Sequence, residues 1–287
     1  MGRGKHQASL DLVEASYGIL EEIQPATVRA VCYRLFVTKI IPDMRTASTA
    51  RVSRQLTWAR ENDHIPWEWI VDETRTPERV ASWDDPKSFM RSVKRCYRKD
   101  LWREQPHDVE VWSEKGTVRG TLGPVLEEYG VTFRVQHGFA SATSLHEAAG
   151  DSQWRPFTVL YVGDHDPSGM HMSEIDLPVR LERYEADMDV VRIALISNDL
   201  SGLPHFDLAS KKGDRRHDWY KARYGDRCWE LDAMSPVDLR ARVEEEIRNR
   251  INWSTWERSR KAEAAEIATI DTAISNWQTA ISRPDSE

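Results

Sequence analysis

The chain has 287 residues, of which 40% are hydrophobic and 30% are charged, a composition typical of a soluble globular protein and not of a disordered one. It contains no run of about 18 consecutive apolar residues, which excludes a membrane span. The N-terminal segment lacks the apolar core of a secretion signal, so we expect a cytoplasmic protein, associated with the nucleoid if the source is prokaryotic. The three cysteines, Cys32, Cys96 and Cys228, lack metal-ligand spacing and fit a reducing compartment.

The net charge of −7 argues against a protein that coats nucleic acid without selectivity. Its distribution is uneven, because residues 1–106 carry 18 Lys and Arg against 15 Asp and Glu, and the remainder carries 22 against 32. A basic half that binds phosphates beside an acidic half that binds metal would produce this asymmetry. Ordinary solvated helix surfaces would produce it as well.

Apolar spacing in the first half of the chain predicts helices separated by turns. The predicted helices are Ser9–Ile23, Ala26–Val37, Ala50–Glu61 and a basic helix that starts after Asp85 and ends near Arg103. Residues 64–71 alternate in the manner of a strand or wing. Helix, turn, helix and wing together indicate a winged-helix module over residues 1–104.

From residue 105 to 236 the pattern changes to alternating strands and helices. The predicted strands are 109–112, 131–135, 157–162 and 190–196, and the predicted helices are 117–129, 141–149 and 168–184. Such alternation predicts an α/β domain with a parallel, doubly wound sheet. Residues 237–287 are expected to form a C-terminal helical extension. Its short heptad seam, which runs from Ile267 to Ile281, fits packing onto the body or self-association.

Three carboxylates follow two of the predicted strands. Glu114 comes just after the first strand, and Asp164 and Asp166 come just after the third. Because ligands bind at the carboxyl ends of parallel strands, we expect these side chains to meet at one edge of the sheet. Hard oxygen ligands of this kind suit Mg²⁺, with Mn²⁺ as an alternative. The competing interpretation is that Asp-x-Asp only caps the next helix, and we interpret His165 as a residue of the site wall.

The segments Val109-Glu-Val-Trp-Ser-Glu-Lys115 and Val159-Leu-Tyr-Val-Gly-Asp-His-Asp-Pro-Ser-Gly169 resemble the two acidic motifs of Toprim domains. Among Toprim proteins they are most similar to type IIB topoisomerase (topoisomerase VI) A subunits, meiotic break-forming transesterases and stand-alone "mini-A" proteins. Glu230-Leu-Asp-Ala233 resembles the Glu-rich motif that closes the domain in that group. The resemblance implies Mg²⁺-dependent DNA cleavage, with Glu114, Asp164 and Asp166 as metal ligands and Glu114 also catalytic.

The same group carries an Arg followed four residues later by the Tyr that attacks DNA, and Arg29 with Tyr33 resembles that pair. Residues four apart lie on one face of a helix, so a guanidinium there can hold a phosphate or favour the phenolate. Cys32 departs from the pattern, because many relatives have a second aromatic there. Tyr33 also fits the alternative of an ordinary core aromatic, since it lies beside Val31 and Leu35.

Two basic stretches are predicted to bind the DNA backbone. Arg51 and Arg54 lie in the third helix, and Arg91, Arg95 and Arg98 are spaced i, i+4 and i+7 on the later helix. Lys115, next to Glu114, is included in the predicted DNA contacts. A solvated helix face explains each stretch equally well.

The sequence therefore predicts a DNA-cleaving enzyme with an N-terminal winged helix and a Toprim domain. The resemblance implies a homodimer, in which the Tyr of one protomer works with the metal of the other. No ATPase region is visible, so ATP-driven strand passage would need a partner subunit supplied in trans. Two alternatives stay open: a Toprim nuclease that hydrolyses DNA with water, and a non-catalytic Toprim protein that binds DNA.

Overall fold

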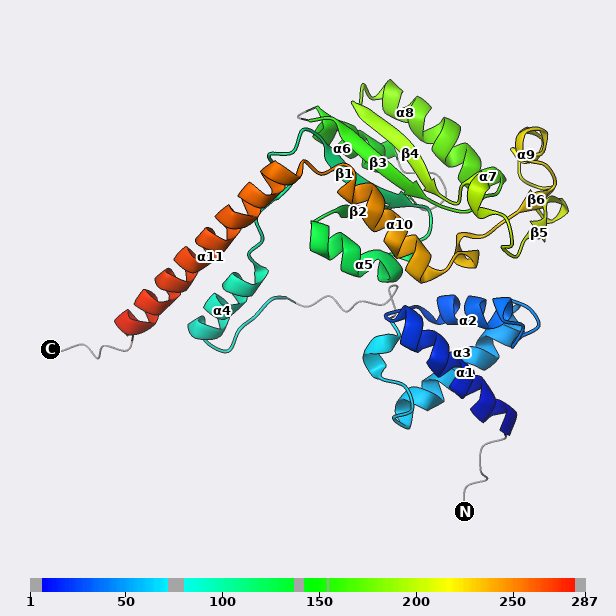
Figure 1. Cartoon of the computed structure of the whole chain (residues 1–287), viewed down its shortest axis with the longest axis horizontal. Coiled ribbons are helices and arrows are strands. Elements are labelled where there is room, and N and C mark those ends of the chain that lie inside the picture. The colour runs from blue at the N-terminus through cyan, green and yellow to red at the C-terminus, as the bar shows by residue number, and fades with distance from the viewer. Residues whose placement is uncertain (1–6, 72–79, 137–141, 154, 282–287) are drawn as a thin grey trace, which may run out of the picture. The chain divides into compact units, whose positions relative to one another are not determined.

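The computed structural model describes residues 7–71, 80–136, 142–153 and 155–281 (Figure 1). The chain divides into two compact units. Unit 1 comprises Met1–Thr76 and Val109–Asn249, and unit 2 comprises Pro77–Asp108 and Arg250–Glu287. None of the described helices is both long and apolar enough to cross a membrane.

Unit 1 begins with three helices that pack around one apolar core. They are α1 (Gln7–Ile23), α2 (Val28–Val37) and α3 (Thr46–Glu61), close to the predicted bounds. Leu20, Leu35 and Leu56 contribute one fully buried side chain from each helix. The α2 N-terminus is capped by the Thr27 hydroxyl, which accepts a hydrogen bond from the Ala30 amide at 3.2 Å.

The strand predicted over residues 64–71 is wrong. This stretch contains a 3₁₀ turn, Trp67–Trp69, and its only ladder contact among the described residues is an isolated bridge between Ala26 and Ile70. The stretch is held against α1, because the Trp69 ring packs 5.1 Å from that of Tyr17. Without a pairing strand, the alternating pattern had nothing to form a sheet with. The winged-helix assignment therefore stays a prediction.

The second half of unit 1 is built on a parallel sheet, as predicted. Its strands are β1 (Asp108–Ser113), β2 (Thr132–Val135), β3 (Phe157–Val162) and β4 (Met188–Ala194), in the order β2-β1-β3-β4 (Figure 1). β1 pairs parallel with β2, and β3 pairs parallel with β4. From β1 the chain adds a strand on one side, and then from β3 a strand on the other. The strand order therefore reverses between β1 and β3, which is where open α/β sheets bind ligands.

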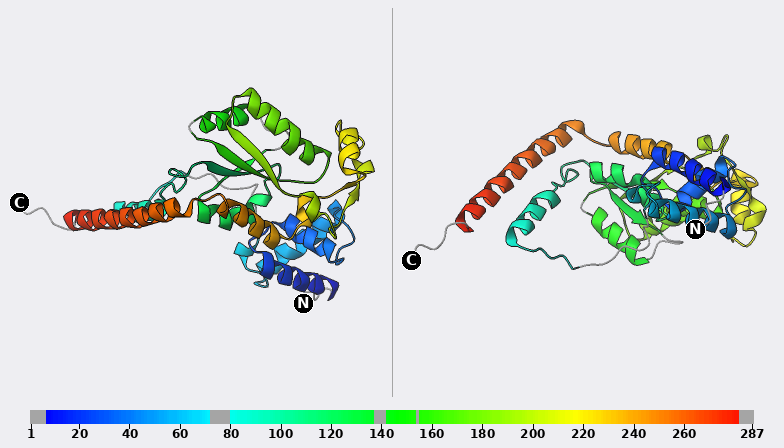
Figure 2. Two further views of the ribbon diagram at one scale, coloured as in Figure 1. Left: turned by 45° about the horizontal axis from the view of Figure 1, so that its top comes forward. Right: turned by 90° about the horizontal axis from the view of Figure 1, so that it is seen from below.

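Helices cover both faces of this sheet (Figure 2). One face carries α6 (Ala142–Ser152) and α8 (Leu177–Arg183), and the opposite face carries α5 (Val118–Tyr129) and α10 (Pro236–Arg248). Under α6 and α8, the side chains of Trp112, Tyr161 and Met172 form the centre of a buried cluster. β1 and β3 are consequently covered on both sides, which explains why the sequence of β3 is almost uniformly apolar and why Glu110 of β1 is buried.

The helix predicted over residues 168–184 is divided into three parts. A short helix, α7 (Pro167–His171), leads into a π-helical turn over Met172–Asp176 and then into α8. Pro178 follows directly after the π turn, in which the Leu177 amide bonds to the Met172 carbonyl, and this irregular ladder accommodates the missing N–H of the proline. The first part matters most for the site, because α7 begins directly at Asp166.

Short elements complete unit 1 beyond β4. A 3₁₀ turn spans Ser197–Asp199, and β5 (Phe206–Asp207) pairs antiparallel with β6 (Arg227–Cys228). Between these two strands lie a 3₁₀ turn over Leu208–Lys211 and α9 (His217–Tyr224). A further 3₁₀ turn, Leu231–Ala233, precedes α10.

Unit 2 contains two helices that pack against each other, α4 (Pro86–Cys96) and α11 (Trp253–Ile281). The predicted end of α4 near Arg103 is wrong, because the chain is extended at Tyr97, and Asp100 accepts amide hydrogen bonds that form a turn. Lys94 pairs with Asp271 at 2.7 Å, and Ile274 of the predicted seam is buried. The side chain of Ile281, the last seam residue, lies outside the described residues.

Candidate metal and phosphate site

The three predicted ligands lie at the carboxyl ends of two neighbouring strands. Glu114 directly follows β1, and Asp164 and Asp166 follow β3 within four residues of its end. These are the two strands between which the strand order reverses. We call Glu114, Asp164 and Asp166 the acidic site.

The loop after β3 is held in a fixed conformation. Gly169 has no room for a side chain, because a Cβ there would overlap the carbonyl oxygen of Asp164. The guanidinium of Arg192, which projects from β4, donates to that same carbonyl at 2.8 Å and to the carbonyl of Gly163 at 3.0 Å. The backbone that presents both aspartates is therefore preorganised.

The two carboxylate oxygens of Asp166 have different partners. Its Oδ1 accepts the Gly169 amide at 2.8 Å and caps α7, which confirms the capping interpretation. Its Oδ2 lies 3.0 Å from the Nζ atom of Lys211. One carboxylate oxygen thus anchors the turn, and the other faces a cation.

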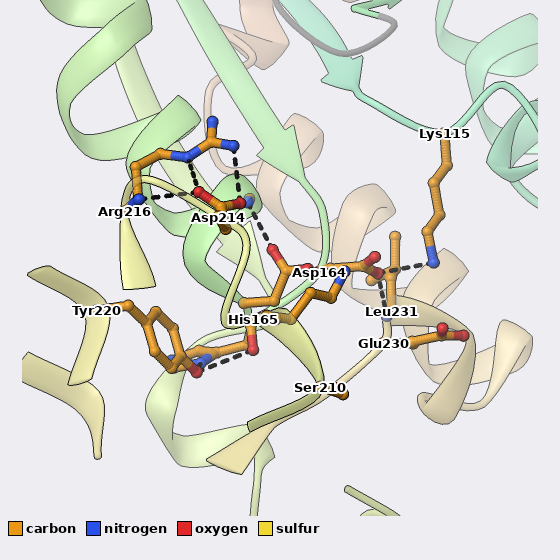
Figure 3. Close-up of polar contacts among 12 residues, drawn as sticks. Lys115, Asp164, His165, Ser210, Asp214, Arg216, Tyr220, Glu230 and Leu231 are labelled. Atoms are coloured by element: carbon orange, nitrogen blue, oxygen red, sulfur yellow. Dashed lines mark hydrogen bonds and ion pairs between the residues drawn. The ribbon is translucent and has the colours of Figure 1, made fainter. Parts of the chain in front are cut away.

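Asp164 is held by a second lysine. Its Oδ1 lies 2.8 Å from Lys115 Nζ and accepts the Leu231 amide at 2.6 Å. Figure 3 shows Lys115 reaching from the end of β1 toward Asp164. Burial alone lowers the pKa of Lys115, but Asp164 and Asp232 outweigh it and raise that pKa, so Lys115 is charged at neutral pH.

Glu114 differs from the two aspartates because its carboxylate has no hydrogen bond or ion pair within the described part of the chain. Burial, together with the negative charges of Asp164 and Asp166, raises its pKa to about 7. Like charges that are brought together in a partly buried place favour the neutral acid unless a cation joins them. Glu114 is therefore the carboxylate that a bound cation would stabilise most.

A second acidic pair connects this site to helix α2. His165 and Trp229 form a two-bond bridge, at 2.9 and 3.0 Å, that brings Glu230 and Asp232 beside the acidic site. Lys115 lies 3.3 Å from Asp232. Arg29 donates to the same residue at 3.3 Å and to Glu230 at 3.2 Å. The predicted Glu-rich motif thus lies between Arg29 and the acidic site.

Tyr33 lies on α2, four residues after Arg29, but it is only 6% exposed. Its ring packs edge-on against Phe36. Burial first, and then the carboxylates of Glu230 and Asp232, raise the pKa of its hydroxyl above the ordinary value. In this conformation the phenol is protonated at neutral pH and needs activation before it can attack.

His165 is part of the buried wall behind the aspartates. Its Nδ1 lies 2.7 Å from the hydroxyl of Tyr220, which is beside it in Figure 3. Its ring packs edge-on against Tyr224 and Trp229. Burial, and next the positive charge of Arg192, lower the pKa of His165 to about 4. The imidazole is consequently neutral at pH 7.

The predicted DNA-binding residues fall in three different settings. Arg51 and Arg54 are exposed on α3 in unit 1. Arg91, Arg95 and Arg98 are exposed in unit 2, the first two on α4 and Arg98 just beyond its end. Lys115 is instead engaged with Asp164 and Asp232, and its side chain is only 18% exposed.

The donor set of the acidic site fits Mg²⁺ chemically. Among the described residues no three or more His, Cys, Asp and Glu side chains are grouped closely enough to enclose a metal by themselves. Mg²⁺ in phosphoryl-transfer sites takes only one or two carboxylates and completes its shell with waters and phosphate oxygens. Glu114 and Asp164 Oδ2 supply such oxygens, since both are without a partner in the described residues.

Two residues of this region were not predicted from the sequence. Arg192 carried a signal, because a lone Arg in the apolar run of β4 must find partners when it is buried. Lys211 carried none, because it lies in the charged run Lys211-Lys-Gly-Asp-Arg-Arg216, and nothing in the sequence distinguishes it from the other cations there.

Comparison of the chain with protein-family models, with curated proteins and with solved structures found no match.

Proposed function

We propose that the chain is a Mg²⁺-dependent DNA strand-cleaving enzyme, similar to the A subunit of type IIB topoisomerases. The observation that carries the proposal is the position of Glu114. It is a partly buried carboxylate without an ion pair among the described residues, burial and the negative charges of Asp164 and Asp166 raise its pKa, and it lies where the strand order reverses. Acidic groups with perturbed pKa values in such a position are characteristic of functional sites.

A bound Mg²⁺ would neutralise charge on the phosphate oxygens and stabilise the leaving oxygen. Glu114, Asp164 and the Oδ2 atom of Asp166 would hold it, with the loop geometry fixed by Gly169 and Arg192. Arg29, whose side chain is 48% exposed, is the cation best placed to bind the phosphate next to Tyr33. Arg51 and Arg54 would position the DNA backbone without reading its sequence.

In the leading mechanism Tyr33 is the nucleophile. Its oxygen would form a bond to phosphorus and lose its proton, the phosphodiester bond would break, and one DNA end would leave as a hydroxyl. A specific observation also favours the second candidate, hydrolysis by water. Tyr33 is buried and its pKa is raised, so in the conformation described here it is not presented to DNA.

The homodimer and the ATPase partner belong to this proposal through the family resemblance alone. In the structure Arg29 pairs with Glu230 and Asp232 of its own chain. A shared active site would therefore require these two ion pairs to open, or to form again with the partner protomer.

The proposal is tested by incubating the protein with supercoiled plasmid and Mg²⁺. We expect cleavage that falls by at least about 100-fold in Asp164→Asn, because a metal ligand is lost. Asp238→Asn is the matched control, because Asp238 is exposed on α10. This variant should cleave DNA at the parental rate. Cleavage at the parental rate in a folded Asp164→Asn protein would contradict the assignment.

Tyr33→Phe separates the two mechanisms, since it removes only a hydroxyl from a packed ring. Under the transesterase mechanism, the variant neither cuts DNA nor forms protein–DNA adducts. The adducts are detected by comparing denatured samples with and without protease treatment. Cutting that continues without adducts would establish hydrolysis. The thermal midpoint of the variant checks that packing is unchanged.

A further inference from the structure

The two aspartates of the acidic site are paired with lysines that differ in accessibility. The Lys115 side chain is 18% exposed and contacts two carboxylates, Asp164 and Asp232. The Lys211 side chain is 41% exposed and contacts one, Asp166, whose side chain is 4% exposed. Lys115 is therefore fixed, whereas Lys211 can leave its partner and remain hydrated.

Lys211 contacts the one carboxylate oxygen of Asp166 that could coordinate a metal. The Oδ1 atom of Asp166 is committed to the Gly169 amide, so Oδ2 is the oxygen available to a metal. That oxygen is the one that Lys211 contacts, at 3.0 Å. An ammonium group and a divalent cation cannot both bind it closely, because their like charges repel.

We propose that Lys211 is an intrinsic competitor for the metal, which occupies Asp166 until a divalent cation displaces it, and that the released ammonium then binds the DNA phosphate. This inference rests on the proposed function, because it assumes that the acidic site binds Mg²⁺. Lys211 belongs to the 3₁₀ turn Leu208–Lys211, whose N-cap Asp207 accepts the Ala209 amide. The backbone is thus fixed, and only the side chain needs to move.

The rearrangement has an electrostatic consequence. Without metal, Lys211 and Lys115 balance the charges of Asp166 and Asp164, and Glu114 forms no ion pair within the described residues. With metal, the cation takes over that balance, and the ammonium of Lys211 becomes an uncompensated positive charge beside it. Metal binding would therefore make the ammonium of Lys211 available to bind a DNA phosphate.

The test is the affinity for Mn²⁺ in the absence of DNA, measured by the loss of the free Mn²⁺ signal in electron paramagnetic resonance, with Mg²⁺ as competitor. Lys211→Met retains the apolar stem and removes the charge, so we expect Mn²⁺ to bind about fivefold more tightly, the value of a partly exposed ion pair. Lys211→Arg retains the competitor and should stay near the parent. Lys212→Met is the matched control, because Lys212 is the exposed neighbour and contacts none of the ligands.

A merely structural role for Lys211 predicts the opposite sign, because losing the ion pair would loosen the site and weaken binding. Mn²⁺ affinity in Lys211→Met that is equal to or weaker than the parental affinity overturns the inference. If the parent binds Mn²⁺ and Asp164→Asn weakens it, that failure concerns Lys211 alone. If the parent shows no Asp164-dependent binding, the proposed function itself fails, and the inference with it.

Discussion

Two glutamates four residues apart, Glu110 inside β1 and Glu114 just past its end, have opposite surroundings. Glu110 is 4% exposed and accepts hydrogen bonds from Arg134 Nε at 2.6 Å and Trp112 Nε1 at 2.7 Å. Glu114 has neither kind of partner in the described residues and faces two carboxylates instead. A buried charge is kept either by full pairing or by function. The first glutamate serves the fold, and the second is available for a ligand.

The largest effect on stability is expected at the paired glutamate. Glu110→Gln removes the negative charge and one of the two oxygens that accept from Arg134, and should lower the free energy of unfolding by about 2–4 kcal/mol. Urea unfolding at pH 8 measures this, and Mn²⁺ affinity, measured on the folded protein, should stay at the parental value. A cost below about 1 kcal/mol would mean that the pairing of Glu110 is not what distinguishes it.

Glu114→Gln should have the opposite sign. The pKa of Glu114 is about 7 in the folded chain against an ordinary value of 4.5, so the ionised form destabilises the fold and the penalty grows as pH rises between those values. At pH 8 the variant should gain about 1–2 kcal/mol, less than the full shift implies because the group is partly solvated.

At pH 5 Glu114 is largely protonated in the folded parent but still mostly ionised in the unfolded chain, so the gain from Glu114→Gln should fall to about a quarter of its value at pH 8. Thermal unfolding at the two pH values, without divalent cations, is the measurement. The same variant should lose DNA cleavage. A stability gain that does not depend on pH would show that burial and repulsion from Asp164 and Asp166 do not raise the pKa of Glu114.

The smallest effect on stability is expected at Asp151, the exposed partner of Arg134. Asp151 contacts Arg134 at 3.0 Å, but its side chain is 59% exposed. Asp151→Asn should therefore change the free energy of unfolding by less than about 0.5 kcal/mol, as is usual for solvated ion pairs. A loss as large as that of Glu110→Gln would indicate that the whole cluster, and not the buried contact, stabilises β1.

The sequence was sufficient to place Glu114, Asp164 and Asp166 at one edge, because strand periodicity and the parallel-sheet rule depend on local pattern. It was not sufficient for their counter-ions. Lys211 reaches Asp166 only because the chain after β4 folds back through a two-stranded ribbon. Contacts of that kind depend on the path of the whole chain, which no short window of residues encodes.

The local errors have a similar origin. Residues 64–71 alternate as a strand would, but a strand also needs a partner, and packing of Trp69 gave a 3₁₀ turn instead. The basic helix stops at Cys96, although its composition continues to favour a helix, because Tyr97 turns toward Glu266 of α11. In both places a tertiary contact outweighs local preference.

Unit 2 is assembled from segments that are synthesised far apart in time. α4 leaves the ribosome before any strand of the sheet, whereas α11, against which it packs, follows all of the strands. An 11-residue helix is too short to persist alone in water. We therefore expect unit 1 to fold first on the nascent chain. The segment of α4 would not form a stable helix until α11 has been synthesised. The exposed arginines of α4 would acquire their helical spacing only after translation reaches α11.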